Sequence, residues 1–494
     1  RVSSTSSTGS LEASLRRPME LEAVLRCYIV RLPEENVLAR RDAEKEPDKR
    51  YLRGSYAKAS VEPGTQMNST VRITKRVCLH LLESKDADHY QRFTGNGLDY
   101  DLLCSKCKSA PADMEANLRV VSPDCFKEIE QEGWWDGIIG EPEISIRASN
   151  LYFEHESRRL PELASIQFLD IQPVVSSLNV WLAISSDGTL IRLDLNLGSI
   201  RSGPRLPLGL VDLQEKAMLR ITRNGELAVV ANARGQHGAV LAVESGQVTL
   251  LLDRGSYHED SSTFSVAFIE TAKQTLLIHG TAWNRLDISD ARTGKLLTER
   301  SPTSYKQGEN RPPHYLDYFH CELSVSPGQQ FIADNGWVWH PAGIVTTWNV
   351  PRWLQENIWE SEDGPTKKTL CQRAYYWDGP VCWIDDQHLV VGGYGADDEW
   401  LIPAACIFDV TTGKQVRWFP GPKGAMIFDT HLYSWNEAGI SVWDVSTGER
   451  LATDNDLVPV SYHPGSKCFL TVLGDGNFRL SRLASRPESI DQRP

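Results

Sequence analysis

The chain has 494 residues, of which 41% are hydrophobic and 24% are charged, and its formal net charge is −13. This length suits two or three domains or one large repeat architecture, and the composition is that of a soluble folded protein. The acidic balance argues against binding to nucleic acid or to anionic lipid, because phosphate contacts need a basic surface.

No stretch of the sequence is apolar for long enough to cross a bilayer, and its first residues lack the zones of a secretory signal. Ten cysteines are too few for a disulfide framework in a chain of this length. Most of them stand singly in apolar runs, which is typical of buried thiols in a reducing compartment. We therefore expect a cytoplasmic protein with no membrane partner and a monomeric architecture.

Residues 1–66 contain a Ser/Thr-rich start, one short candidate for an amphipathic helix at 21–32, and a segment of mixed charge with Pro and Gly. Because the rest of this region has almost no apolar periodicity, we predict that it is disordered or not native to the fold. Residues 486–494 are polar and are expected to form a flexible tail.

Residues 67–150 carry two short motifs of metal-binding residue types. Cys78-x-His80 lies on a predicted strand, where residues two apart point to the same side, and Cys104-x-x-Cys107 follows 23 residues after His80. Zinc prefers four tetrahedral sulfur or nitrogen ligands, and Cys-x-x-Cys lets two thiolates reach one ion. We predict a structural zinc site at Cys78, His80, Cys104 and Cys107. A chance grouping and a redox pair at Cys104 and Cys107 are the alternatives, and Cys125 could replace His80 as the fourth ligand.

The same region predicts a helix that begins with Pro123 after a Ser122 cap, and then a turn and a strand within 137–146. This small α+β module is too short to bury much apolar surface, so we expect a bound metal ion to stabilise it. Its ligand pattern resembles a zinc ribbon of the Cys-His-Cys-Cys kind.

From about residue 160 the sequence repeats a pattern of short strands and turns. In the clearest copies a strand is followed by an Asp-x-x-Thr-Gly turn and then by a second strand. These copies are "LDISDARTGKLLTER" (286–300), "CIFDVTTGKQVRWF" (406–419) and "SVWDVSTGERLATD" (441–454). Gly413 and Gly448 are 35 residues apart, and Gly294 precedes Gly413 by 119, close to three periods of about 40. A four-stranded antiparallel blade needs three hairpin turns in each such period.

Weaker copies complete a set of seven predicted blades. Their ranges are 165–210, 215–253, 262–300, 318–355, 373–420, 424–454 and 456–484. One blade cannot cover both of its faces, and a closed ring of blades does so. The fold class is therefore mostly β, a seven-bladed β-propeller at 160–485 preceded by the small α+β zinc-binding module. A pair of β-sandwiches is the main structural rival.

The repeats resemble those of WD-repeat propellers, with Trp443-Asp444 at the site of the namesake dipeptide and Phe408-Asp409 as a near copy. The resemblance covers about 320 residues and is degenerate, because most blades lack the Gly-His pair and the Trp-Asp dipeptide. A quinoprotein-like ring is the alternative. A WD-repeat-like architecture implies a platform for binding other proteins.

No motif for a nucleophile elbow, a zinc protease, a phosphate loop or a dinucleotide site occurs in the sequence. A polar, aromatic-rich set around the fourth predicted blade could form a ligand pocket, and it comprises His314, Asp317, His320, Trp337, Trp339 and His340. The interpretation that we favour is that the two tryptophans pack between blades and the histidines are solvated or bonded to backbone. Adjacent acids at 397–399 could bind calcium or a basic partner, but we favour a solvated hairpin tip because consecutive acids point in divergent directions. Residues 349–368 read as a short helical insertion between blades, with Trp353 and Trp359.

These patterns favour a non-enzymatic protein–protein interaction scaffold with structural zinc, an unidentified protein partner and no nucleic-acid partner. The alternative function is an enzyme or small-ligand binder that uses a propeller face pocket around His320 and His340.

Overall fold

A computed structural model describes most of the chain from residue 144 onward and parts of the segment before it. The described residues are 74–78, 80, 89–93, 99–104, 107, 118–120, 144–207, 209–300, 304–305, 308–339, 341–395, 398 and 401–487. The predicted helices at 21–32 and after Ser122 lie outside these residues. The predicted extension at 1–66 also lies outside them, as does most of the predicted tail at 486–494.

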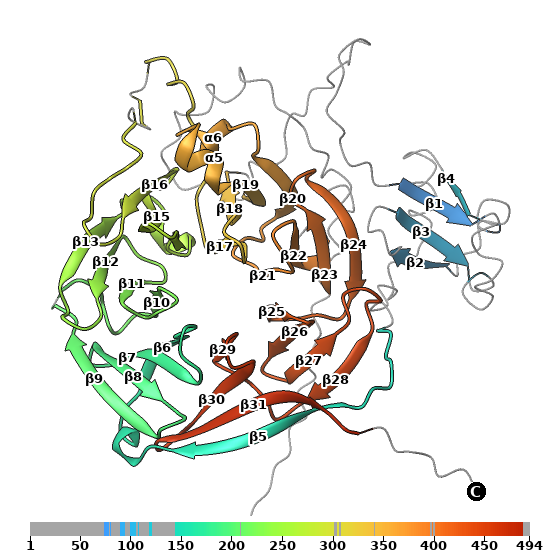
Figure 1. Ribbon diagram of the computed structural model, residues 1–494. Helices are drawn as coiled ribbons and strands as arrows, with labels where there is room; N and C mark the ends of the chain where they lie inside the picture. The colour runs from blue at the N-terminus through green and yellow to red at the C-terminus, as the bar shows by residue number, and fades with distance from the viewer. Residues whose placement is uncertain are drawn as a thin grey trace, which may run out of the picture. The chain divides into compact units, whose positions relative to one another are not determined.

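Seven antiparallel sheets follow one another around a ring and form the predicted seven-bladed β-propeller (Figure 1). The first two blades comprise β6 (Phe168–Pro173), β7 (Val180–Ser185), β8 (Thr189–Asp194), β9 (Ser199–Arg205), β10 (Ala217–Ile221), β11 (Leu227–Asn232), β12 (His237–Ala242) and β13 (Val248–Asp253). The third and fourth comprise β14 (Val266–Glu270), β15 (Thr275–Ala282), β16 (Arg285–Asp290), β17 (Leu323–Val325), β18 (Phe331–Val338), β19 (Ala342–Asn349) and β20 (Lys368–Ala374).

The last three blades complete the ring. They comprise β21 (Val381–Trp383), β22 (His388–Tyr394), β23 (Ile402–Asp409), β24 (Lys414–Pro420), β25 (Ala425–Asp429), β26 (His431–Asn436), β27 (Gly439–Trp443), β28 (Arg450–Asp454), β29 (Ser461–His463), β30 (Cys468–Gly474), β31 (Asn477–Ser485) and β5 (Leu151–Arg159). Short 3-10 turns occur at Pro161–Leu163 and Glu259–Ser261. In each four-stranded blade the first strand lies near the ring axis and the last at the rim (Figure 1).

The repeated Asp-x-x-Thr-Gly segments form the same turn in three blades. The glycine N–H donates to the aspartate carbonyl in each, at 2.9 Å for Gly294, 2.8 Å for Gly413 and 2.7 Å for Gly448. All three glycines have φ between +70° and +79°, a conformation that side chains with a Cβ rarely adopt. The local chemistry of the turn therefore explains why this motif recurs in the sequence.

The apolar core lies mainly between neighbouring blades. All six residues of β7 are buried, whereas most of the rim strand β9 is exposed. One inter-blade cluster joins the last blade to the first and includes Trp181, Leu470 and Phe478. Trp348 and Trp353 belong to the cluster between the third and fourth blades. Each blade thus covers a face of its neighbour, which is the physical reason for closing the ring.

Strand β5 closes the ring by pairing with β31, from Asn477↔Arg159 to Ser485↔Leu151. The last blade therefore combines the first and last strands of the propeller (Figure 1). The sequence pattern predicts a start at residue 160 and leaves β5 out. Its sequence, LYFEHESRR, lacks the alternation of a buried strand because β5 is a rim strand with few buried side chains.

A helical insertion lies inside the fourth blade, between β19 and β20. It contains α5 (Val350–Gln355) and α6 (Glu360–Asp363), and the Asn349 side chain caps α5 by accepting from the Arg352 N–H. The sequence pattern places this insertion between blades, with the fourth blade ending at 355 and the fifth beginning at 373. That prediction was wrong, because the rim strand β20 follows the insertion and pairs with β19.

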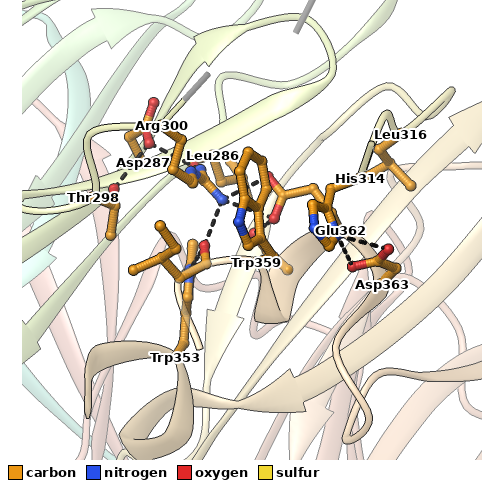
Figure 2. Close-up of polar contacts among 12 residues, drawn as sticks. Leu286, Asp287, Thr298, Arg300, His314, Leu316, Trp353, Trp359, Glu362 and Asp363 are labelled. Carbon is orange, nitrogen blue, oxygen red and sulfur yellow. Dashed lines mark hydrogen bonds and ion pairs between the residues drawn. The ribbon is translucent and has the colours of Figure 1, made fainter. Parts of the chain in front are cut away.

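The third blade has three described strands, and the Arg300 side chain occupies part of its outer edge (Figure 2). The fully buried guanidinium donates to the Leu286 carbonyl of β16 and lies 2.8 Å from the Asp287 carboxylate. Thr298 Oγ1 accepts from the Ile288 N–H at 2.9 Å. Side chains after β16 thus satisfy backbone groups that a fourth strand would otherwise pair.

Arg300 also binds the insertion of the fourth blade. Its guanidinium lies 2.7 Å from the Glu362 carboxylate and donates to the Ile358 carbonyl at 2.7 Å. The Trp359 ring covers this guanidinium at 5.1 Å, and His314 stacks on Trp359 with ring centres 4.5 Å apart. Figure 2 shows this column of Arg300, Trp359 and His314, with Asp363 beside the histidine.

In the part of the chain that the structure describes, no helix has the length and apolar character that a membrane crossing requires.

Candidate metal centre and loop face

The segment before the propeller contains a separate four-stranded sheet. Its strands are β1 (Thr74–Cys78), β2 (His89–Phe93), β3 (Asp99–Cys104) and β4 (Leu118–Val120), in the order β2-β3-β1-β4. Strands β1 and β3 are parallel neighbours, with Val77 opposite Leu102. Parallel strands end at the same edge of a sheet, so the residues that end β1 and β3 lie together.

Each of these two strands ends in a cysteine of the predicted metal set. Cys78 ends β1 and Cys104 ends β3, and the Cys104 N–H donates to the Cys78 sulfur at 3.4 Å. His80 and Cys107 follow within three residues. The sheet topology therefore brings together two motifs that are 24 or more residues apart.

The four side chains offer donor atoms that all lie within 4.8 Å of one another, with the three cysteines buried and His80 half-buried. His80 Nδ1 lies 3.3 Å from Cys107 Sγ and 3.5 Å from Cys104 Sγ. Tetrahedral zinc, with bonds of about 2.3 Å to sulfur and about 2.0 Å to nitrogen, places such atoms about 3.5 Å apart. The donor types and spacing fit zinc.

The protonation state of the cluster depends on whether it holds a cation. Burial, together with the neighbouring thiols of Cys78 and Cys104, raises the pKa of the Cys107 thiol to about 12. Three thiolates would repel one another without a positive charge between them. A bound cation removes that repulsion and releases the thiol protons. Four protein ligands leave no coordination position for substrate, which is the arrangement of structural zinc sites.

The structure thus brings all four predicted ligands into one cluster that could hold a metal ion. Cys125, the alternative ligand, lies outside the described residues. The likeness to a zinc ribbon remains a prediction. The ligands here stand at the ends of the parallel strands β1 and β3 or just after them. The connection between these strands contains β2, which pairs antiparallel with β3.

The second predicted cluster, around the fourth blade, is divided by the fold. His314 stacks on Trp359 and lies 2.8 Å from the Asp363 carboxylate, at the helical insertion. His320 is buried elsewhere, with its Nδ1 2.5 Å from Asp334 Oδ2. His340 lies outside the described residues, as do Asp397 and Glu399 of the acidic loop.

A small cavity adjoins His320. Nε2 of His320 and Oγ of Ser265 are buried without a hydrogen-bond partner, and both residues line a cavity of about 10 Å³. That volume is about what one water molecule needs. A water here would satisfy both atoms, whereas a substrate would need the surrounding loops to open.

Aromatic side chains gather beside this cavity, from strand β18 and from the connections that precede β14, β17 and β21. Tyr257, Phe319, Trp337 and Trp377 form a column of stacked rings, with centre distances of 5.7, 4.0 and 5.1 Å. Trp337 Nε1 donates to Ser262 Oγ at 2.9 Å and Trp377 Nε1 donates to the Ser261 carbonyl at 2.8 Å. These bonds fix the column to the loop between β13 and β14.

The sequence pattern identifies Trp337 and Trp339 in this group but misses Tyr257, His258 and Tyr375. These three stand in turn regions with no apolar periodicity, and only the order of the blades brings them beside the β18–β19 turn. The aromatic run Tyr375-Tyr376-Trp377 at the end of a strand is a signal that could have indicated Tyr375.

No protein-family model matches this chain, and a search of curated proteins also finds no match. Among solved structures, the chain is similar to one titled "Structure of U3-55K", with 11% sequence identity and a TM-score of 0.42. The alignment covers 66% of this chain and 98% of that one. The seven-bladed assignment therefore rests on the strand pairings of this chain itself.

Proposed function

We propose that this chain is a non-enzymatic interaction protein whose propeller loops bind a protein partner. The observation that carries this proposal is the distribution of exposed aromatic side chains. Within the described residues the aromatic members of the exposed large hydrophobic set are Tyr257, Trp339 and Tyr375, and they stand in the β13–β14 connection, the β18–β19 turn and the β20–β21 connection. Exposed aromatic residues that gather on one face of a folded protein mark interaction sites.

In this proposal the small sheet is a stabilised accessory module. A zinc ion held by Cys78, His80, Cys104 and Cys107 would supply the folding energy that so few strands cannot obtain from apolar burial. Its role is structural because its four ligands complete the coordination shell.

The test is affinity capture with the full chain, followed by reconstitution from purified components. We expect a partner that forms a complex of fixed stoichiometry in isothermal titration calorimetry. The proposal is contradicted if no captured protein binds once purified, while the chain binds or converts a small molecule.

A small-ligand role is the second candidate, and the observation that favours it is the buried Nε2 of His320, which has no hydrogen-bond partner beside the water-sized cavity. Its test is the His320→Gln variant, which keeps a polar side chain of similar reach. Loss of a specific small-ligand affinity without loss of stability would support that role. A loss of stability alone would show that His320 serves the fold through its contact with Asp334.

A further inference from the structure

The exposed aromatic residues of this protein occupy one end of the ring. Tyr257 lies in the β13–β14 connection, Trp339 in the β18–β19 turn and Tyr375 in the β20–β21 connection. In an antiparallel blade, the turn between the second and third strands and the connection to the next blade lie at the same end. We call Tyr257, Trp339 and Tyr375 the aromatic loop surface. Their exposed fractions are 49%, 44% and 59%.

The three residues are linked to one another through the loops. The His258 ring contacts both Tyr257, at 4.7 Å, and Trp339, at 4.9 Å between ring centres. The Tyr375 N–H donates to the Pro341 carbonyl at 2.8 Å, which holds Tyr375 beside the turn that carries Trp339. The surface therefore rests on packed and hydrogen-bonded loops, and its rings need little ordering when a partner binds.

Three residues with a left-handed backbone conformation also lie in these loops. His258, Tyr375 and Asp378 have φ of 56°, 55° and 54°, in the left-handed region that non-glycine residues seldom adopt. The Asp378 carboxylate holds two loops in place by accepting from the N–H groups of Thr263, at 2.9 Å, and Glu322, at 3.3 Å. Strained residues of this kind persist where surrounding contacts enforce them, and they cluster at ligand sites.

Two acidic residues and two arginines stand beside the surface. Glu259 and Asp260 follow Tyr257 and His258 directly, and Asp260 is exposed. Arg254 lies in the same loop, but its buried guanidinium donates to the carbonyls of Gly235, Glu259, Ser262 and Thr263. Arg234 reaches the Asp260 backbone carbonyl at 3.5 Å. The chain as a whole carries a net charge of −13.

We propose that the aromatic loop surface binds a basic segment of a partner protein, by stacking of arginine or lysine side chains on its rings. This inference rests on the proposed interaction function and adds the class of partner. Ring faces attract cations within about 6 Å, most strongly those of tryptophan. The carboxylates of Glu259 and Asp260 add a second attraction that is absent for a neutral or acidic segment. A single-stranded nucleic acid also stacks on aromatic rings, but it needs a basic groove for its phosphates.

The test is selection from a random-peptide phage library against the full chain, followed by fluorescence anisotropy with the selected peptides. We expect the selected peptides to be enriched in arginine or lysine. Trp339→Ala and Tyr375→Ala should each raise Kd about tenfold, the loss typical of an aromatic contact at the centre of an interface. Replacing arginine in the peptide by citrulline, which removes the charge and keeps the shape, should weaken binding similarly.

Matched control variants distinguish the loss of this surface from effects that any substitution of an exposed residue would have. Leu197 is 78% exposed in the β8–β9 turn, at the opposite end of a blade, so Leu197→Ala should leave Kd unchanged. Asp260→Asn should weaken binding, whereas Glu215→Gln, an exposed acid in the β9–β10 connection at the same end of the ring, should not. Urea unfolding of each variant shows whether its fold is intact.

Three results would overturn the proposal. Equal binding of the selected peptides to wild type, Trp339→Ala and Tyr375→Ala would leave the interaction function standing and exclude this site. Selected peptides without an excess of basic residues would exclude the proposed class of partner. Binding of a single-stranded oligonucleotide that Trp339→Ala abolishes would make the surface a nucleic-acid site.

Discussion

The Arg300 guanidinium lies 2.7 Å from the Glu362 carboxylate, and this buried pair joins the third blade to the helical insertion of the fourth. Both side chains are almost fully buried, at 0% and 3% exposure. Asp287 contributes a second carboxylate at 2.8 Å from the same guanidinium. Arg300 therefore occupies part of the outer edge of the third blade and also holds the helical insertion of the fourth blade against it.

Arg300→Ala should destabilise the propeller strongly, because it leaves the carboxylates of Asp287 and Glu362 buried without their cation. Removing one partner of such a pair lowers the free energy of unfolding by about 3–5 kcal/mol. The measurement is urea unfolding followed by tryptophan fluorescence. Arg292→Ala is the control, because Arg292 pairs with Glu226 at the surface and its loss should change stability by about 1 kcal/mol or less. Equal effects of the two variants would show that the buried pair contributes no special stability.

The contribution of Lys367 to the stability of the protein should rise with pH in the range where this side chain titrates differently in the folded and unfolded states. Burial lowers the pKa of Lys367 from 10.5 to about 8, although Asp334, Glu362 and Asp363 partly oppose this shift. Between these two pH values the unfolded chain binds the proton and the folded chain does not, so folding becomes more favourable as pH increases.

Lys367→Met isolates this effect, because other titrating groups are common to both proteins. The difference in unfolding free energy, wild type minus variant, should increase by on the order of 2 kcal/mol from pH 8 to about 10.5. Urea unfolding at several pH values measures it. A difference that stays constant with pH would show that the ammonium keeps its ordinary pKa in the folded protein.

Ring closure by β5 predicts a sharp boundary for a folded propeller. A chain that begins at residue 160 lacks β5 and leaves β31 with an unpaired edge, so it should unfold at lower temperature and aggregate more readily. A chain that begins at residue 144 keeps β5 and the contacts of Ile146 and Arg147 with Arg450. Differential scanning calorimetry compares the two, and a peptide of residues 150–160 added to the shorter chain should restore part of the loss. Equal melting temperatures would contradict the role of β5.

The parts of the fold that the sequence predicts are those with a strong local signal. The Asp-x-x-Thr-Gly turns require a glycine at positive φ, and the buried strands around them are apolar, so both are visible without the structure. The rim strands β5 and β20 cannot be identified from the sequence in this way, because few of their side chains are buried. The number of blades was predicted correctly, whereas β5 joins its blade through a long-range pairing with β31.

The candidate sites also differ in how far the sequence alone predicts them. Cys78, His80, Cys104 and Cys107 are identified from spacing alone, since metal ligands must be of particular types at short intervals. The aromatic loop surface combines residues from three separate connections, and nothing in their local sequence shows that they meet. His314 and His320 are six residues apart in the sequence, yet one lies at the helical insertion and the other beside the small cavity.

Metal content is the most direct test of the central claim, that the cluster before the propeller is a structural zinc site. Elemental mass spectrometry on the full chain, purified without tags or chelators, should find about one zinc per chain. Cys104→Ser should lose the metal together with thermal stability, whereas Cys371→Ala, which removes a thiol of the propeller strand β20, should keep it. Absence of zinc from the wild-type protein, or unchanged zinc in Cys104→Ser, would contradict the account.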